Sequence, residues 1–305
     1  MSVPMIVDTD PGVDDAVALM LAAASPEVQL LGVTTVYGNV GVELTTDNAL
    51  RLRALAGLDH LPLAAGAARP LVYPRDQRTD SWHGPDGLGG RADLLPEPTG
   101  PVHHRGAVAL MADLLHAVSA PVTLVAIGPL TNIALLLAAY PEVKARISRI
   151  VAMGGLLSGG PLAEFNIRSD PEAAHRVLVE EDVPITLVPL DLTLRAAVDS
   201  AWLTELAAAG PRCAMLAGVI EHCRKITGRD VMALHDALAV LEAAVPGTLR
   251  TTSMPLEVVC DRRPDRGAVQ AGSGQCANRH VVQVALDADL PTINAAILDR
   301  LRGLR

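Results

Sequence analysis

Aromatic side chains are scarce in this sequence, whose 305 residues include one Phe, two Trp and three Tyr. Proteins that bind single-stranded nucleic acid stack bases on such rings and attract the phosphate backbone with positive charge. Here 25 Lys and Arg stand against 34 Asp and Glu, which gives a formal net charge of -9. The composition therefore argues against nucleic acid as a partner.

Long apolar runs are also missing. Apolar runs such as residues 16–24 and 133–140 are far shorter than the roughly 20 residues that a membrane-spanning helix needs. Asp8 and Asp10 stand where a signal peptide would be apolar. We therefore expect a cytoplasmic protein with no membrane partner.

Cysteine is sparse, and its spacing matches no common metal or redox motif. The four residues are Cys213, Cys223, Cys260 and Cys276, with no CxxC pair and no zinc-type histidine spacing. We expect them to be small, mostly buried apolar side chains in a reducing compartment.

Short β-branched runs alternate with longer Ala- and Leu-rich runs from the N-terminus onward. This alternation is typical of strand-helix-strand units that build a parallel sheet. Strands are predicted at residues 5–7, 30–36, 122–127, 149–153 and 185–189, and helices at 13–24, 43–56, 106–118, 131–139 and 171–181. Asp170 is predicted to cap the last of these helices, with Pro171 in its first turn.

Beyond Asp191 the pattern becomes more helical, with helices predicted at 202–209, 212–227 and 235–244. Two later extended runs, 256–260 and 280–286, are predicted to pair as an antiparallel appendage. No linker rich in Gly, Pro and Ser divides the chain. We therefore predict a single α/β domain over residues 1–305, with a mainly parallel central sheet flanked by helices.

Four carboxylates fall within eight residues where the first strand gives way to the first helix. They are Asp8, Asp10, Asp14 and Asp15, and the Pro-Gly turn after Asp10 lets acids on its two sides converge. Carboxylate oxygens are the ligands that Ca²⁺ and Mg²⁺ prefer. Helix capping and the helix dipole explain one or two of these acids but not four. The segment therefore predicts a site for a hard cation.

Other polar residues fall where further strands should end. Asn39, Glu164 and Asn166 could share one site with the acids, because ligands of open parallel sheets bind beyond the carboxyl ends of the strands. Turn preference explains Asn39 equally well. A Gly-Pro pair after Ile127 exposes its carbonyl oxygen, which could also meet the cation.

Two histidines stand in patterns that allow a catalytic role. His235 and Asp236 open a predicted helix and could supply a proton donor and a further cation ligand, although such a pair is more often a helix cap. His83 follows Trp82 in a glycine-rich stretch that could be a lid over a ligand or only an exposed turn. Neither pattern identifies a function by itself.

Together these motifs resemble the inosine-uridine-preferring nucleoside hydrolase family over almost the whole chain. The opening DTDPGVDD at residues 8–15 is highly specific to that family. It is followed in order by VYGN at 36–39, HGPDGLG at 83–89, GPLTN at 128–132, MGG at 153–155, AEFN at 163–166, DPEA at 170–173 and HD at 235–236. Several motifs in the right order carry more weight than any one of them.

The resemblance implies hydrolysis of the N-glycosidic bond of ribonucleosides to free base and ribose, with a tightly bound Ca²⁺. The resemblance allows both purine and pyrimidine nucleosides as substrates, and both salvage and catabolism as the pathway. Family members commonly form homodimers or homotetramers, so the resemblance also implies a homo-oligomer.

The same resemblance implies a role for each matching residue. Asp10, Asp15, the carbonyl oxygen of Ile127 and Asp236 would hold the cation, and Asp10 would be the general base. His235 would protonate the leaving base, and His83 matches a lid histidine. The side chains that would bind the ribose are Asp14, Asn39, Met153, Glu164, Asn166 and Asp236.

These roles agree with the chemistry of the bond. Cleavage between C1′ and the base nitrogen leaves positive charge on the ribosyl ring and negative charge on the base. Carboxylates stabilise the first and a proton donor the second. Since a histidine near its ordinary pKa is a suitable acid, we expect His235 to titrate in its usual range.

Two stretches depart from the family's pattern. Residues 156–162 lack the Asn that reaches the ribose 5′-hydroxyl in the family, so recognition of that hydroxyl does not carry over. No aromatic residue occurs from 203 to 305, so Trp82 is expected to be the only aromatic near the base. The predicted helix at 212–227 offers instead Val219, His222, Cys223 and Arg224.

Two other functions stay open at this point. A haloacid-dehalogenase-like Mg²⁺ phosphatase also begins with Asp-x-Asp after its first strand, but it normally continues with Gly-Thr or Gly-Val. A non-catalytic nucleoside or ribose sensor would keep the cation and sugar ligands without turnover. Products separate the three: phosphate, a bound ligand without turnover, or free base and ribose.

Overall fold

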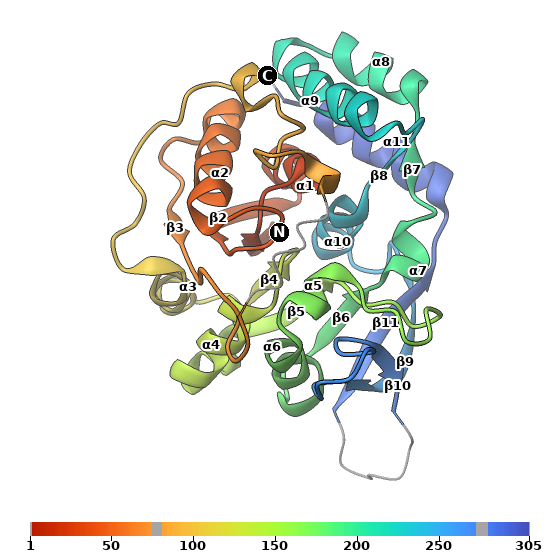
Figure 1. The fold of residues 1–305 in the computed structure, drawn as a ribbon. Helices are drawn as coiled ribbons and strands as arrows, with labels where there is room; N and C mark the ends of the chain where they lie inside the picture. The colour runs from red at the N-terminus through yellow and green to blue at the C-terminus, as the bar shows by residue number, and fades with distance from the viewer. Residues whose placement is uncertain (1, 75–80, 273–279, 305) are drawn as a thin grey trace.

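The computed structural model describes residues 2–74, 81–272 and 280–304, and a mainly parallel sheet runs through its centre (Figure 1). Within these residues the sheet has nine strands in the order β10-β9-β11-β6-β5-β4-β1-β2-β3. Six strands, from β6 to β3 in that order, pair in parallel. They are β1 (Val3–Thr9), β2 (Val28–Thr35), β3 (Leu63–Ala65), β4 (Val122–Ala126), β5 (Ile147–Met153) and β6 (Ile185–Val188). The predicted fold class is confirmed.

Helices cover both faces of the sheet, and this explains why its central strands are almost continuously apolar. In β1, Met5 and Val7 belong to one hydrophobic cluster and Ile6 to the other, because successive side chains of a strand point to opposite faces. The helices that contribute side chains to the first cluster are α1 (Val13–Ala24), α2 (Val42–Ala56), α8 (Ser200–Ala208), α9 (Pro211–Thr227), α10 (His235–Ala244) and α11 (Leu290–Leu301). Those that contribute to the second are α3 (Gly106–Ala117), α4 (Thr131–Ala139) and α6 (Pro171–His175).

Several predicted helices match closely: α1, α4 and α10 have the predicted bounds. The helix predicted at 171–181 is α6 followed by a π-helical turn, Arg176–Glu180. Asp170 caps α6 as predicted, since its Oδ1 accepts a hydrogen bond from Ala173 N at 3.1 Å. Short elements complete the connections: α5 (Phe165–Ser169), α7 (Leu190–Thr193), β7 (Ala197–Val198), β8 (Met232–Ala233) and the 3₁₀ turns Ser81–His83, Ala92–Leu94 and Pro141–Arg146.

The late extended runs are not an appendage, so this prediction is wrong in part. β9 (Arg250–Val258) pairs antiparallel with β11 (Val281–Asp287), as predicted, and also with β10 (Val269–Ala271). However, β11 pairs in parallel with β6, so all three strands extend the main sheet. Val282 and Val284 of β11 are fully buried in the second hydrophobic cluster, and burying them against the sheet is what an isolated hairpin could not do.

The burial of the cysteines and the character of the helices bear on two of the predictions from composition. Cys213 and Cys223 are buried and Cys260 is partly buried, whereas Cys276 lies outside the described residues. No helix in the described part of the chain combines the length and the apolar character needed to span a membrane.

Asp170 bonds to two further segments besides capping α6. Its side chain is fully buried, and its Oδ2 accepts hydrogen bonds from Leu71 N at 2.9 Å and Thr131 Oγ1 at 2.7 Å. We expect Asp170→Ala to lower the free energy of unfolding by about 2–4 kcal/mol, because it removes a cap and leaves buried donors unpaired. Urea unfolding followed by circular dichroism measures this loss.

The matched control is Asp289→Ala, which removes the exposed cap of α11, where Asp289 accepts from Thr292 N at 3.3 Å. A cap whose surroundings are open to water should cost only about 0.5–1 kcal/mol. Equal losses for the two variants would show that the buried bonds of Asp170 add nothing.

Candidate active site

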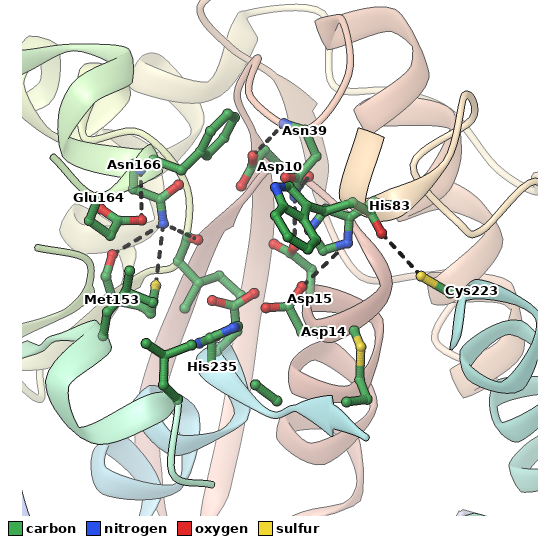
Figure 2. A pocket seen from close by; sticks show the side chains of 18 of the residues that line it. Asp10, Asp14, Asp15, Asn39, His83, Met153, Glu164, Asn166, Cys223 and His235 are labelled. Atoms are coloured by element: carbon green, nitrogen blue, oxygen red, sulfur yellow. Dashed lines mark hydrogen bonds and ion pairs between the residues drawn. The ribbon is translucent and has the colours of Figure 1, made fainter. Parts of the chain in front are cut away.

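The carboxyl end of β1 and the first turn of α1 place three acids at the floor of a cavity of about 340 Å³ (Figure 2). Asp10, Asp14 and Asp15 are buried, and Asp236 joins them from the start of α10. One carboxylate oxygen from each of Asp14, Asp15 and Asp236 lies within 4.8 Å of the others. Asp14 and Asp15 of this group both follow the Pro-Gly turn, whereas Asp10, which precedes the turn, lines the same cavity without belonging to the group.

Backbone and hydroxyl donors fix the carboxylate of Asp15. Thr9 Oγ1 donates to Oδ1 at 2.5 Å, and Gly12 N donates to Oδ2 at 2.9 Å. Asn39 Nδ2 also donates to Oδ2, at 3.2 Å. These bonds hold Asp15 in one position at the N-terminus of α1.

Asp10 is held between two glycine-containing turns. Its Oδ2 accepts from Asn39 N at 2.7 Å, and its carbonyl oxygen accepts from Asn39 Nδ2 at 3.0 Å. A Cβ on Gly38 would overlap Oδ2, and one on Gly128 would lie 2.6 Å from Oδ1. Only glycine leaves space for the Asp10 carboxylate at these two positions, which explains the glycines of the VYGN and GPLTN motifs.

The fourth acid of the opening motif does not belong to the cavity. Asp8 lies within the sheet, where its Oδ1 accepts from Thr34 Oγ1 at 2.5 Å and Asn132 Nδ2 at 2.8 Å. Burial raises the pKa of Asp8 to about 7. Asn132 also bonds to Thr35 O and Ala67 N, so this pair ties together loops that follow the strands.

Burial and mutual repulsion raise the pKa values of the floor acids. Desolvation raises the pKa of Asp10 well above its usual range, and the neighbouring carboxylates raise it further. The same causes raise the pKa of Asp236 and bring that of Asp15 to about 6. Clustered buried carboxylates repel one another unless positive charge lies among them.

The opposite wall of the cavity carries Met153, Glu164 and Asn166, from the end of β5 and the start of α5 (Figure 2). Glu164 caps α5: Oε1 accepts from Asn166 N at 2.8 Å, and Oε2 accepts from Gly155 N and Ile167 N, each at 3.0 Å. Despite these bonds, burial raises the pKa of Glu164. The three donors fix its orientation toward the cavity.

Asn166 links this wall to Ile127. Its Nδ2 donates to Ile127 O at 3.0 Å and to Met153 O at 3.2 Å. Ile127 lines the cavity, as predicted, and in this structure its carbonyl oxygen accepts the amide of Asn166.

His235 lines the cavity at the first position of α10 (Figure 2). Its Nδ1 is 2.8 Å from Thr193 Oγ1, a buried hydroxyl of α7 that no sequence motif indicates. The expectation of an ordinary pKa is wrong, because desolvation lowers the pKa of His235, while Asp14 opposes this shift.

The glycine-rich stretch lies against the cavity with Trp82 and His83, and a lid over a ligand requires such a position. His83 Nδ1 accepts from Val13 N at 3.1 Å and lies 3.7 Å from Asp14 Oδ1. The Cys223 thiol donates to Trp82 O at 3.2 Å, which joins this loop to α9. Burial raises the pKa of that thiol to about 11, so it stays protonated and able to donate.

The rest of the cavity lining differs from the residues that the sequence predicts there. Cys223 and Arg224 line the cavity, whereas Val219 and His222 do not, and Phe165 lines it as a second aromatic besides Trp82. None of residues 156–162, all of them described, lines it. The lining residues that the sequence missed are Leu190, Leu194, Thr227, Arg229, Met232 and Ala233. They come from α7, the end of α9 and β8, which no local pattern connects with the acids.

Comparison with known proteins agrees with this geometry. Residues 5–295 match the model of the inosine-uridine preferring nucleoside hydrolase family. The chain belongs to this family. It is therefore a hydrolase that acts on nucleosides, and the phosphatase alternative is wrong.

The proteins similar to this chain have names that indicate different substrate ranges. The chain is 41% identical over 300 residues, 95% of each chain, to the non-specific ribonucleoside hydrolase RihC of Klebsiella pneumoniae. It is 48% identical over 201 residues, 65% of this chain and 64% of the other, to the pyrimidine-specific RihA of Photobacterium profundum. The purine-preferring ribonucleoside hydrolase of Gardnerella vaginalis has a similar structure, with a TM-score of 0.89 at 28% identity over 99% of this chain and 98% of that one.

A methyl group at position 38 tests the geometry of the floor. We expect Gly38→Ala to reduce kcat/KM for nucleoside hydrolysis at least about 100-fold, because the added Cβ displaces the Asp10 carboxylate. Ribose release measures the loss, and circular dichroism monitors folding. Gly41→Ala is the control, since its Cβ would meet only Glu43 Oε2 at 3.3 Å. Equal activity of the two variants would contradict the close packing of Asp10.

Proposed function

We propose that this enzyme hydrolyses the N-glycosidic bond of ribonucleosides to free base and ribose, with Asp10 as general base, His235 as leaving-group acid and Ca²⁺ as cofactor. The observation that carries the proposal is that buried acids and His235 line one cavity. This arrangement matches the two charges that develop when the C1′–N bond breaks.

The donor set of the floor fits a hard divalent cation. Its charged ligands are all carboxylates, and three of them approach within 4.8 Å although they are buried. We propose that Asp10, Asp15, Asp236 and the carbonyl oxygen of Ile127 hold Ca²⁺, and the position of Asp14 makes it a further candidate. When bound, the cation would hold ribose hydroxyls and lower the pKa of a coordinated water.

Asp10 is suited to take a proton from the attacking water. Its carboxylate is buried in the cavity lining, and Asn39 N fixes its Oδ2. The surrounding carboxylates also stabilise positive charge on the ribosyl ring. Attack from this floor, opposite the departing base, would invert the configuration at C1′.

The two side walls orient the ribose. Asn39 and Asp14 face the cavity from one side, and Met153, Glu164 and Asn166 face it from the other (Figure 2). Because backbone donors already fix Glu164, its remaining lone pairs point in set directions toward a sugar hydroxyl. A rigid sugar site of this kind reduces the entropy lost when the reacting groups align.

His235 can deliver a proton through Nε2. As an imidazolium, His235 donates its Nδ1 proton in a hydrogen bond to Thr193 Oγ1 and can transfer its Nε2 proton to the departing base, which leaves a neutral imidazole. Desolvation lowers the pKa of His235, which makes the charged form a stronger acid. Thr193 is therefore the residue that orients the ring in this proposal.

We also propose that residues 1–305 form one domain, that the protein is a cytoplasmic homodimer or homotetramer, and that it serves nucleoside catabolism or salvage. The continuous sheet supports the first statement. The family resemblance supports the others.

Replacing His235 tests the leaving-group acid. We expect His235→Ala to reduce kcat/KM on inosine and uridine by about 10²–10⁴-fold, the usual contribution of a general acid. Hydrolysis of 4-nitrophenyl riboside should change little, because 4-nitrophenolate leaves without a proton. Thr193→Val should give a smaller loss with the same substrate pattern. Undiminished rates on inosine and uridine alike would remove His235 from the mechanism.

Removal of the cation tests the cofactor and the activity together. Ribose release is measured from inosine, adenosine, guanosine, uridine and cytidine with and without EGTA. We expect chelation to abolish release and Ca²⁺ to restore it. Ca²⁺ should also raise the thermal midpoint of the chelated protein in a concentration-dependent way, and Asp236→Asn should weaken this rise.

Release that is insensitive to EGTA, together with an unchanged midpoint, would rule out the cation. Binding of these nucleosides by the Ca²⁺-loaded protein without any ribose release would point instead to the sensor.

A further inference from the structure

A cation-π pair stands at the mouth of the cavity. The Arg229 guanidinium carbon lies 3.5 Å from the centroid of the Trp82 ring, and both residues line the cavity. Arg229 directly follows Gly228, the C-cap of α9, and Trp82 belongs to the loop that carries His83. Trp82 is 49% exposed, so the pair lies where the cavity opens to solvent.

The guanidinium of Arg229 has donors to spare. Among the described residues it has no hydrogen bond or ion pair, and its contact is the face of the Trp82 ring. The nearby Arg224 differs, because its guanidinium donates to Ser200 Oγ, Glu221 Oε2 and Asp230 O. Arg224 is thus committed to the structure, whereas Arg229 presents N–H groups that a ligand in the cavity can use.

The depth of each residue decides which part of a nucleoside would meet Arg229. The acids that would hold the ribose are buried at the floor, and Arg229 is exposed at the mouth. Because His235 and Arg229 line the same cavity, a base with its glycosidic nitrogen near His235 would extend its far edge toward the exposed mouth where Arg229 lies. That edge carries an exocyclic oxygen in uracil and hypoxanthine, and an amino group in cytosine and adenine.

We propose that Arg229, positioned by Trp82, binds the exocyclic oxygen on the far edge of the base and makes this enzyme favour oxo-bases over amino-bases. The inference rests on the proposed function. A guanidinium can only donate, so it pairs with a carbonyl oxygen and repels an amino group. Its bond to the oxygen strengthens as the departing base gains negative charge, and this lowers the barrier to cleavage.

Steady-state kinetics on uridine, cytidine, inosine and adenosine test the proposal. The wild-type enzyme should have a higher kcat/KM on uridine than on cytidine and on inosine than on adenosine. We expect Arg229→Met, which keeps the length of the side chain without its donors, to reduce kcat/KM on the oxo-nucleosides by about 10- to 100-fold. The values for cytidine and adenosine should be unchanged or higher. Arg229→Lys should retain part of the preference.

The matched control is Arg262→Met. Arg262 also lies over an aromatic ring, with its guanidinium carbon 4.2 Å from the centroid of Tyr73, but it does not line the cavity. This variant should keep the wild-type rates on all four nucleosides.

Three results would overturn the inference. A uniform loss on all four nucleosides in Arg229→Met would mean that Arg229 only holds the Trp82 loop in place. A wild-type preference for cytidine or adenosine would show that the far edge is not bound by a donor. Absence of ribose release from every nucleoside by the Ca²⁺-loaded wild type would reject the proposed function, and the inference with it.

Discussion

The structure depends on one electrostatic constraint, which is the concentration of buried negative charge where β1 ends and α1 begins. Asp10, Asp14 and Asp15 come from this one segment, and Asp236 adds a fourth carboxylate from α10. Their raised pKa values express the free energy that such a cluster costs in a protein interior. The proposed cation and an electron-poor ribosyl ring would both offset this unfavourable charge.

Residues that surround the acids hold that charge in place. The buried pair of Asp8 and Asn132 connects the ends of neighbouring strands, and Asn39 bonds to both Asp10 and Asp15. Gly38 leaves the space that the Asp10 carboxylate fills. The family motifs are thus mixtures of residues that would meet the substrate and residues that position them, and only the contacts distinguish the two kinds.

The floor and the mouth of the cavity differ in how strictly they are determined. At the floor, hydrogen bonds hold Asp10 and Asp15 in place, and the geometry follows from the ends of the parallel strands. At the mouth, the lining comes from α7, α9 and the Trp82 loop, and includes exposed side chains such as Leu194. The names of related proteins range from non-specific to pyrimidine-specific and purine-preferring. A constant floor combined with a variable mouth would produce such a range.

The sequence by itself determined the α/β class, the bounds of helices such as α1 and α10, and the acids of the floor, because periodicity and a dense local motif are properties of neighbouring residues. The local pattern of acids could not separate Asp8 from the others, since only the structure shows that β1 ends between Asp8 and Asp10 and leaves Asp8 within the sheet. The sequence also missed the incorporation of β11 into the main sheet, the bond between Thr193 and His235, and the meeting of Arg229 with Trp82. Each of these contacts joins segments far apart in the chain, so only the packing of helices on the sheet could bring them together.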